Sequence, residues 1–181
     1  MPATNSQNLS TAMTVISANI EGLTAAKASI LSDMCKRECC HCLCLQESHR
    51  ATHLSRPKIA GMTLVAERPH NKYGSAILIR DDLKVKSVSV SDVGDVDLIT
   101  IEMPGVIVHS VYKPPNEKFV LPTLSNTDLP RIVIRDFNSH STTWGYDITD
   151  DNGEAVEEWA ESCDLTLIQD AKLPKSFNSA R

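Results

Sequence analysis

Four short apolar stretches of this sequence end in polar residues of the kinds that hold metal ions or phosphates. These residues are Asn19, Gln46-Glu47, Tyr112 with Pro115-Asn116, and Asp136-Phe137-Asn138. Side chains at strand ends can converge on a shared cleft at the edge of a sheet. Taken singly, each is more commonly a solvated turn residue, because turns favour such side chains.

Taken together, the four sites indicate one chemistry. They supply two carboxylates, Glu47 and Asp136, together with carboxamides, and the chain has no paired cysteine and histidine ligands beside them. This set of hard oxygen ligands suits Mg²⁺ (or Mn²⁺), which binds through one or two carboxylates and a substrate phosphate. A phosphoester substrate is the natural consequence.

Five of the six cysteines fall within ten residues, which raises the question of a zinc site: Cys35, Cys39, Cys40, Cys42 and Cys44. Structural zinc sites usually pair two separated ligand clusters, whereas only Cys163 lies elsewhere. Cys42 and Cys44 alternate into an apolar run, as the buried thiols of a strand do. We therefore expect reduced, mostly buried cysteines and an intracellular compartment.

The bulk composition indicates one soluble domain over 13–181, after a disordered lead-in at 1–12. Of the 181 residues, 41% are hydrophobic and only 4% aromatic, so Val, Ile and Leu must fill most of the core. No apolar run approaches the ~20 residues that cross a bilayer. The net charge of -5 argues mildly against broad nucleic-acid binding. A metal ion can offset carboxylates locally, so charge leaves the partner open.

The elements that would position the polar residues begin with a strand, a helix and a strand. Residues 13–18 read as a buried strand that ends at Asn19. Thr24 is a plausible N-cap for the helix that follows, and 42–45 form a second short strand. This order predicts a βαβ-like opening.

The rest of the chain is richer in strands. Val- and Ile-rich runs separated by turn residues predict consecutive antiparallel strands at 62–66, 75–80, 84–90, 96–103 and 105–112. A loop at 113–130 leads to a strand at 131–135. Asp151 and Glu154 form a capping-box pattern at the start of a helix, and 165–168 read as one more strand. The predicted fold is α/β (α+β), with two mixed sheets packed face to face and flanked by helices.

In this order, the four motifs resemble those of the endonuclease/exonuclease/phosphatase superfamily. The segments RDFNSHSTTWGY, IEGLTAAKASIL and the terminal SFNSAR are similar to the endonuclease domain of non-LTR retrotransposons in particular. The resemblance covers nearly all of 13–181. It implies a four-layer-type sandwich, a divalent metal ion and a DNA substrate.

The resemblance also implies a role for each motif residue. Glu47 corresponds to the metal-binding glutamate, and Asn19 to the asparagine beside the metal and the scissile phosphate. Tyr112 corresponds to the tyrosine that contacts the phosphate. Asp136 matches the aspartate that positions or activates the attacking water, and Asn138 the asparagine that stabilises the phosphate.

Further residues are expected near the DNA. His140 and Asn116 are assigned there by resemblance, although His140 could instead only help fold the turn before Trp144, itself expected to be a packing residue. Basic residues that could meet the DNA backbone are Arg50, Arg56, Lys58 and Lys72. Surface basic residues usually do nothing specific.

Two features depart from the family's pattern. Arg135 stands where the family has glycine, which would remove a backbone freedom, and its cation could pair with Asp136. The family's later aspartate and Ser-Asp-His segment have no counterpart before Arg181, so an incomplete domain without its closing strands is expected. Acid–base help of that kind is worth ~10²–10⁴-fold in rate.

Three functions remain open at this point. The first is a divalent-metal-dependent endonuclease that nicks DNA at a retrotransposon target site, weak or inactive as this fragment. The second is a non-catalytic relic that binds nucleic acid or a protein. The third is a phosphatase acting on small phosphoesters. The resemblance further implies a nuclear protein and a reverse transcriptase domain downstream in a parent polyprotein.

Overall fold

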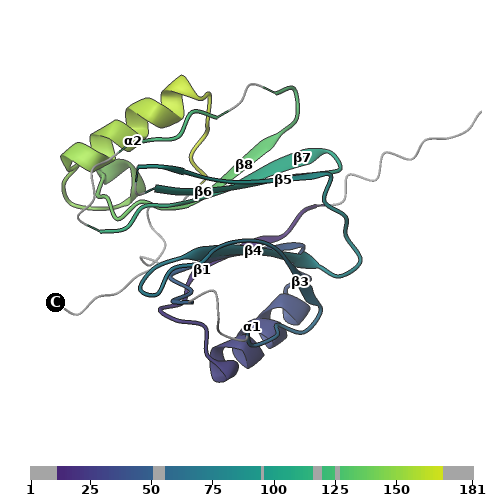
Figure 1. The fold of residues 1–181 in the computed structure, drawn as a ribbon. Helices are drawn as coiled ribbons and strands as arrows, with labels where there is room; N and C mark the ends of the chain where they lie inside the picture. The colour runs from purple at the N-terminus through teal and green to yellow at the C-terminus, as the bar shows by residue number, and fades with distance from the viewer. Residues whose placement is uncertain (1–11, 51–55, 95, 116–119, 125–126, 169–181) are drawn as a thin grey trace, which may run out of the picture.

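Two four-stranded sheets pack face to face, with one helix on the outer face of each (Figure 1). The structure is a computed structural model, and it describes residues 12–50, 56–94, 96–115, 120–124 and 127–168. The layers therefore run helix, sheet, sheet, helix. This arrangement confirms the predicted fold class of two mixed sheets flanked by helices.

The first sheet has the strand order β1-β2-β4-β3. Its strands are β1 (Val15–Asn19), β2 (Cys42–Gln46), β3 (Met62–Arg68) and β4 (Ser75–Arg80). β1 and β2 are parallel and are joined by α1 (Ala25–Arg37), which confirms the βαβ-like opening. Thr24 is the N-cap of α1, because its hydroxyl accepts a hydrogen bond from the backbone N–H of Lys27 at 3.2 Å.

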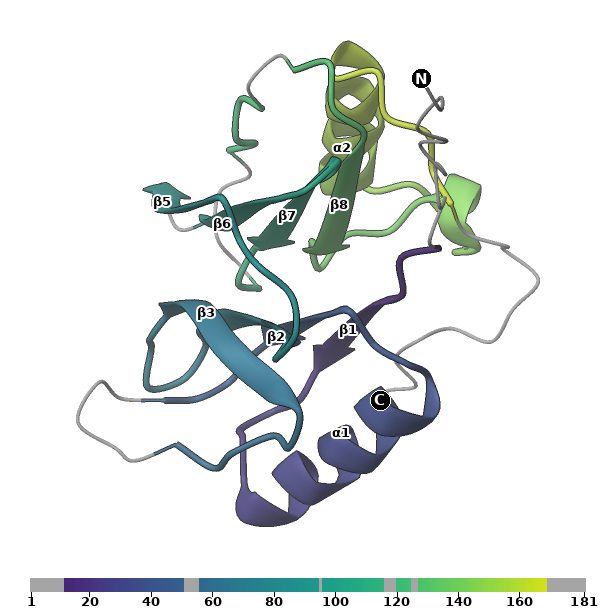
Figure 2. The same ribbon diagram turned by 90° about the vertical axis from the view of Figure 1, so that its right-hand side faces the viewer.

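The second sheet has the order β5-β6-β7-β8. Its strands are β5 (Ser87–Val93), β6 (Val96–Met103), β7 (Val106–Tyr112) and β8 (Arg131–Asp136). The first three form the expected antiparallel meander, whereas β8 lies parallel to β7. A short 3₁₀ turn, η1 (Thr142–Trp144), and the helix α2 (Asp151–Ser162) follow, and α2 lies over the outer face of this sheet (Figure 2).

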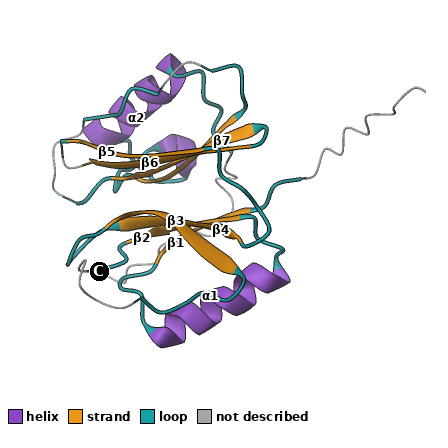
Figure 3. Cartoon of the chain, turned by 45° about the vertical axis from the view of Figure 1, so that its right-hand side comes forward, coloured by secondary structure: helices purple, strands orange, loops and turns teal. Residues whose placement is uncertain are grey.

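The two sheets lie face to face between the two helices (Figure 3). The alternation of side chains along β2 shows how these layers are held together. Leu43 and Leu45 face α1 and pack in its cluster. Cys42 and Cys44 face the other way, into the layer between the sheets, where they pack with isoleucines of β4 and β6. The expected burial is confirmed for Cys35, Cys40, Cys42 and Cys44, whereas Cys39 is exposed.

Some expected elements differ from the observed ones. Residues 165–168 form no strand: the N–H of Leu165 still bonds the Ala160 carbonyl at the end of α2, and Ile168 is 97% exposed. A β-branched pattern without a neighbouring strand cannot make a ladder. The N-cap of α2 is Asp150 rather than Asp151. The lead-in at 1–11, Asn116 and the terminal SFNSAR lie outside the described residues. Neither α1 nor α2 is long and apolar enough to cross a membrane.

Gly153, in the first turn of α2, is in contact with the preceding loop, and its replacement should destabilise the protein. A Cβ at this position would lie 1.8 Å from the carbonyl oxygen of His140. We expect Gly153→Ala to lower the free energy of unfolding by about 1–3 kcal/mol, since the backbone must shift to admit the methyl group. Urea unfolding measures this loss. Glu154→Ala is the control, because Glu154 is exposed in the same turn, and an unchanged midpoint for Gly153→Ala would contradict the prediction.

Candidate active site

The residues predicted to do chemistry come together where the two sheets end. Asn19 and Gln46 are register partners at the ends of the parallel pair β1 and β2. Tyr112 and Asp136 are register partners at the ends of the parallel pair β7 and β8. Parallel strands end at the same edge of their sheet. Each sheet therefore has polar side chains at this edge, here called its polar edge: Asn19 and Gln46 in the first sheet, Tyr112 and Asp136 in the second.

Two hydrogen bonds join these edges across the sheets. Asn19 donates through Nδ2 to Asp136 Oδ2 at 3.0 Å, over a separation of 117 residues. The Tyr112 hydroxyl donates to Glu47 Oε1 at 3.2 Å, over a separation of 65 residues. Four residues chosen from separate sequence motifs are therefore in direct pairwise contact.

The backbone turns sharply after the strands that carry the two carboxylates. Glu47 and Asn138 have φ of 51° and 46°, a left-handed conformation that residues other than glycine rarely adopt. The carbonyl of Glu47 accepts from the N–H of Gly22 at 2.7 Å. Asn138 Nδ2 donates to the Lys113 carbonyl at 2.9 Å, and its N–H points at Asp136 Oδ1 at 3.4 Å. These bonds stabilise both turns and hold the site side chains in place.

Tyr112 is a fully buried phenol beside negative charge. Burial raises its pKa far above the usual value, and the adjoining carboxylates of Glu47 and Asp136 raise it further. Tyr112 therefore remains a neutral hydrogen-bond donor across the working pH range. Glu47 is 21% exposed, and its second oxygen lies 3.6 Å from Nε2 of His49.

The side chains at this edge carry oxygen atoms of the kind that hard divalent cations bind. The donor set consists of the carboxylates of Glu47 and Asp136 and the side-chain oxygens of Asn19 and Asn138. Among the described residues, no group of three or more histidine, cysteine, aspartate or glutamate side chains could hold a metal ion. A cation here would have few protein ligands and would complete its shell with water and phosphate, as Mg²⁺ does.

An aromatic residue that the motifs do not include also borders the site. The ring of Tyr73 lies 6.2 Å from that of Tyr112, and His70 stacks on Tyr73 at 5.1 Å. The exposed ammonium of Lys72 lies 5.2 Å from the centre of the Tyr73 ring. The sequence carries little signal for Tyr73, because the residues between β3 and β4 are typical of a turn.

His140 and Trp144 lie in the loop that follows Asn138. His140 binds Asp150 twice, through Nδ1 at 3.0 Å and through its backbone N–H at 3.1 Å, and its side chain is 51% exposed. Asp150 also caps α2. His140 therefore helps to fold this turn, which was its alternative role. Trp144 is buried and donates to the Ser139 carbonyl, as expected of a packing residue.

Two of the basic residues considered for DNA contact are directed elsewhere. Arg50 and Arg56 converge on one carboxylate, that of Glu67, and Arg50 is 5% exposed. Their guanidinium groups are therefore both engaged with β3, to which Glu67 belongs. Lys58 and Lys72 are exposed.

Arg135 does not pair with Asp136 in the way that its sequence position suggests. Successive side chains of a strand point to opposite faces. The guanidinium carbon of Arg135 lies 4.5 Å from the Trp144 ring centre and 5.2 Å from that of Phe137, and burial lowers its pKa. The Asp136 carboxylate instead accepts from Asn19 and Asn138. The backbone of Arg135 is in the ordinary strand conformation, so no glycine is needed there.

Replacing Arg135 with glycine should therefore destabilise the folded protein. Arg135→Gly removes two cation–aromatic contacts and adds backbone freedom to a strand. We expect a loss of about 1–3 kcal/mol in the free energy of unfolding. Arg135→Met, which keeps an unbranched apolar stem, should lose less. Thermal and urea unfolding of the two variants measure this, and a glycine variant as stable as the wild type would contradict the packing role.

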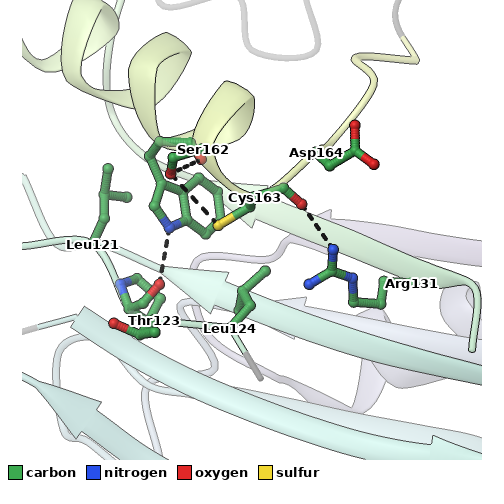
Figure 4. Close-up of a pocket in the computed structure, with 9 residues that line it drawn as sticks. Leu121, Thr123, Leu124, Arg131, Ser162, Cys163 and Asp164 are labelled. Atoms are coloured by element: carbon green, nitrogen blue, oxygen red, sulfur yellow. Dashed lines mark hydrogen bonds between the residues drawn. The ribbon is translucent and has the colours of Figure 1, made fainter. Parts of the chain in front are cut away.

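A cavity of about 440 Å³ lies at the other end of β8 (Figure 4). Its lining includes Leu121, Leu124, Arg131, Trp159, Ser162 and Cys163. Arg131 is the first residue of β8 and Asp136 the last. None of the predicted site residues that the structure describes lines this cavity, so the candidate site is the polar edge and not the cavity.

The chain is similar to known proteins both in part of its sequence and in its fold. Residues 106–181 match the family model described as endonuclease-reverse transcriptase. The endonuclease domain of TRAS1, a telomere-specific non-LTR retrotransposon, has a similar structure, with a TM-score of 0.62, 15% identity, and coverage of 94% of this chain and 78% of that one. A search of curated proteins gives no match.

Two further solved structures are similar over a smaller part. An AP endonuclease from Archaeoglobus fulgidus gives a TM-score of 0.45 at 18% identity, covering 56% of this chain and 41% of that one. TDP2 from Caenorhabditis elegans gives 0.38 at 17% identity, covering 55% and 34%. The predicted resemblance is confirmed in two respects: the fold is similar to the endonuclease domain of a non-LTR retrotransposon over nearly the whole chain, and residues 106–181 match an endonuclease-reverse transcriptase family in sequence.

Proposed function

We propose that this chain is a divalent-metal-dependent endonuclease that hydrolyses DNA phosphodiester bonds, nicking the target site of a retrotransposon. The observation that carries the proposal is the pair of cross-sheet hydrogen bonds, Asn19 to Asp136 and Tyr112 to Glu47. These two bonds join the carboxylates and their donors at one edge of the molecule, which a phosphodiester can reach from solvent. The likeness to an endonuclease-reverse transcriptase family over residues 106–181 supports it.

Each side chain has a task in this mechanism. Glu47, with Asp136 nearby, would hold the cation, which when bound supplies positive charge to a phosphate oxygen. Asp136, oriented by Asn19 and Asn138, positions the attacking water. Tyr112 stays protonated, and its single O–H, which donates to Glu47 in this structure, would turn to donate to the phosphate when substrate binds. Donors placed in advance at developing negative charge are a large source of rate enhancement.

The remaining expectations belong to the same proposal. Lys72 is exposed beside Tyr73, close to the site, and suits a DNA phosphate better than the buried Arg50 does. His140 keeps half of its side chain exposed and can also lie near the DNA. As a retrotransposon endonuclease, the chain would act in the nucleus and would belong to a polyprotein with a reverse transcriptase domain.

A comparison of substrates tests the proposal. The purified chain is incubated with supercoiled plasmid and Mg²⁺, and in parallel with inositol phosphates. Conversion of supercoiled to nicked circles, without release of inorganic phosphate, is expected. Phosphate release without nicking would favour a phosphatase. Plasmid binding in a mobility-shift assay without either reaction would favour a non-catalytic relic.

A further inference from the structure

The polar edges extend beyond the residues assigned so far. In the first sheet, the register places four residues side by side across the strand ends, here called the first row: Asn19, Gln46, Ser75 and Arg68. In the second sheet, the register forms a matching second row: Asp136, Tyr112, Asp97 and Asp92. Each sheet therefore contributes one residue from every one of its strands.

The two rows contact one another in order. At one end, Asn19 bonds Asp136, and Glu47, which follows Gln46, bonds Tyr112. The contacts continue on the far side of Tyr112. There the Ser75 hydroxyl donates to Asp97 Oδ2 at 2.9 Å.

Arg68 closes the far end of both rows. Its Nη2 lies 3.0 Å from Asp92 Oδ2, and its Nε lies 3.7 Å from Asp97 Oδ1. Among the described side chains, Asp97 is thus the only second-row residue that both a hydroxyl and a guanidinium of the first sheet contact. It also lies directly beside Tyr112 on the neighbouring strand.

Asp97 is costly to keep as a carboxylate. Its side chain is 15% exposed, and burial raises its pKa above the usual value despite the opposing effects of Ser75 and Arg68. A buried charge of this kind contributes little net stability, but its directional bonds fix one arrangement of its partners. Because Asp97 lies beside Tyr112, the arrangement that it fixes acts on the active site.

We propose that Asp97 is a positioning residue of the active site: through Ser75 and Arg68 it fixes the spacing of the two sheets at their polar edge, so that Tyr112 meets Glu47 and Asn19 meets Asp136. Asp97 does not itself touch the substrate in this arrangement. The proposal rests on the proposed nuclease function for its kinetic consequences, but its structural consequence can be measured without any activity.

The test compares Asp97→Ala, Asp97→Asn and Ser75→Ala with a matched control, Asp92→Asn. Asp92 shares Arg68 with Asp97 but lies on the edge strand and is 49% exposed. Asp97→Asn can still accept the bond from Ser75 and should show a smaller effect than Asp97→Ala. Thermal unfolding identifies temperatures at which every variant remains folded.

The first measurement is the side-chain amide signal of Asn19 in ¹⁵N-correlated NMR spectra, assigned with an Asn19→Ser variant. Asp97→Ala and Ser75→Ala are expected to shift this signal, and Asp92→Asn to leave it in place. The second is nicking kinetics. A misplaced catalytic group should lower kcat about 10- to 100-fold with KM nearly unchanged.

The outcomes are distinct. An Asn19 signal that stays in place in Asp97→Ala, or that moves equally in Asp92→Asn, overturns the positioning role whether or not the chain nicks DNA. A wild-type kcat retained in Asp97→Ala also overturns it. If the wild type nicks no DNA, the proposed function fails, and the Asn19 signal alone then decides the positioning role.

Discussion

Replacing Asp136 with asparagine is expected to lower the rate of Mg²⁺-dependent nicking at least about 10²-fold. The carboxylate of Asp136 accepts hydrogen bonds from Asn19 at 3.0 Å and from the N–H of Asn138 at 3.4 Å. An amide of nearly the same size keeps the volume but loses the charge and one acceptor. It can neither bind a cation as strongly nor accept a proton from water.

The measurement is the initial rate of nicked-circle formation with protein in excess over plasmid. Asp82→Asn is the matched control, because Asp82 is exposed and pairs only locally with Arg80. Circular dichroism should show that both variants are folded. An Asp136→Asn variant that keeps its rate within threefold of the wild type would remove Asp136 from the mechanism.

Replacing Trp159 with alanine is expected to lower the free energy of unfolding by about 3–5 kcal/mol. Trp159 lies in the apolar cluster between α2 and the second sheet and is 9% exposed. Its ring meets Phe137 edge to face at 5.7 Å, and its indole N–H donates to the Pro122 carbonyl at 2.9 Å. The substitution removes the aromatic contact and leaves that buried carbonyl without its donor.

Urea unfolding followed by far-ultraviolet circular dichroism measures this loss. Trp159→Phe should lose less, since it keeps a ring against Phe137 and removes only the N–H. Phe137 lies between Asp136 and Asn138, so Trp159→Ala should also reduce nicking at temperatures where the protein remains folded. A loss below about 1 kcal/mol, the size expected for an exposed position, would contradict this account of how α2 is anchored.

Local sequence patterns predict most of the helices and strands, because the residues within each element largely determine its conformation. The alternation of Cys42 and Cys44 in an apolar run correctly predicts a strand with buried thiols, and Thr24 correctly marks the start of α1. The failure at 165–168 has the opposite cause. A strand also needs a partner, and whether a partner lies alongside is decided by residues far away in the chain.

The candidate site divides in the same way. Asn19, Glu47, Tyr112 and Asp136 are predictable, because each follows an apolar run and belongs to a recognisable motif. Asp97 is not, because it lies inside a strand and acquires its partners only when the sheets pack. Arg135 is a similar case. Its position in the sequence predicts an ion pair with Asp136, whereas the alternation of side chains along the strand directs it to Trp144 and Phe137.

The most direct test of the proposed function is a Mg²⁺ titration of plasmid nicking by the wild type, Glu47→Gln and the control Glu102→Gln. Glu102 lies at the surface in a pair with Lys86, away from the polar edge. We predict nicking that EDTA abolishes, that Glu102→Gln retains, and that Glu47→Gln lowers at least about 10²-fold at every Mg²⁺ concentration. Nicking by Glu47→Gln at the wild-type rate and with the wild-type dependence on Mg²⁺ would contradict the assignment of the polar edge as the active site.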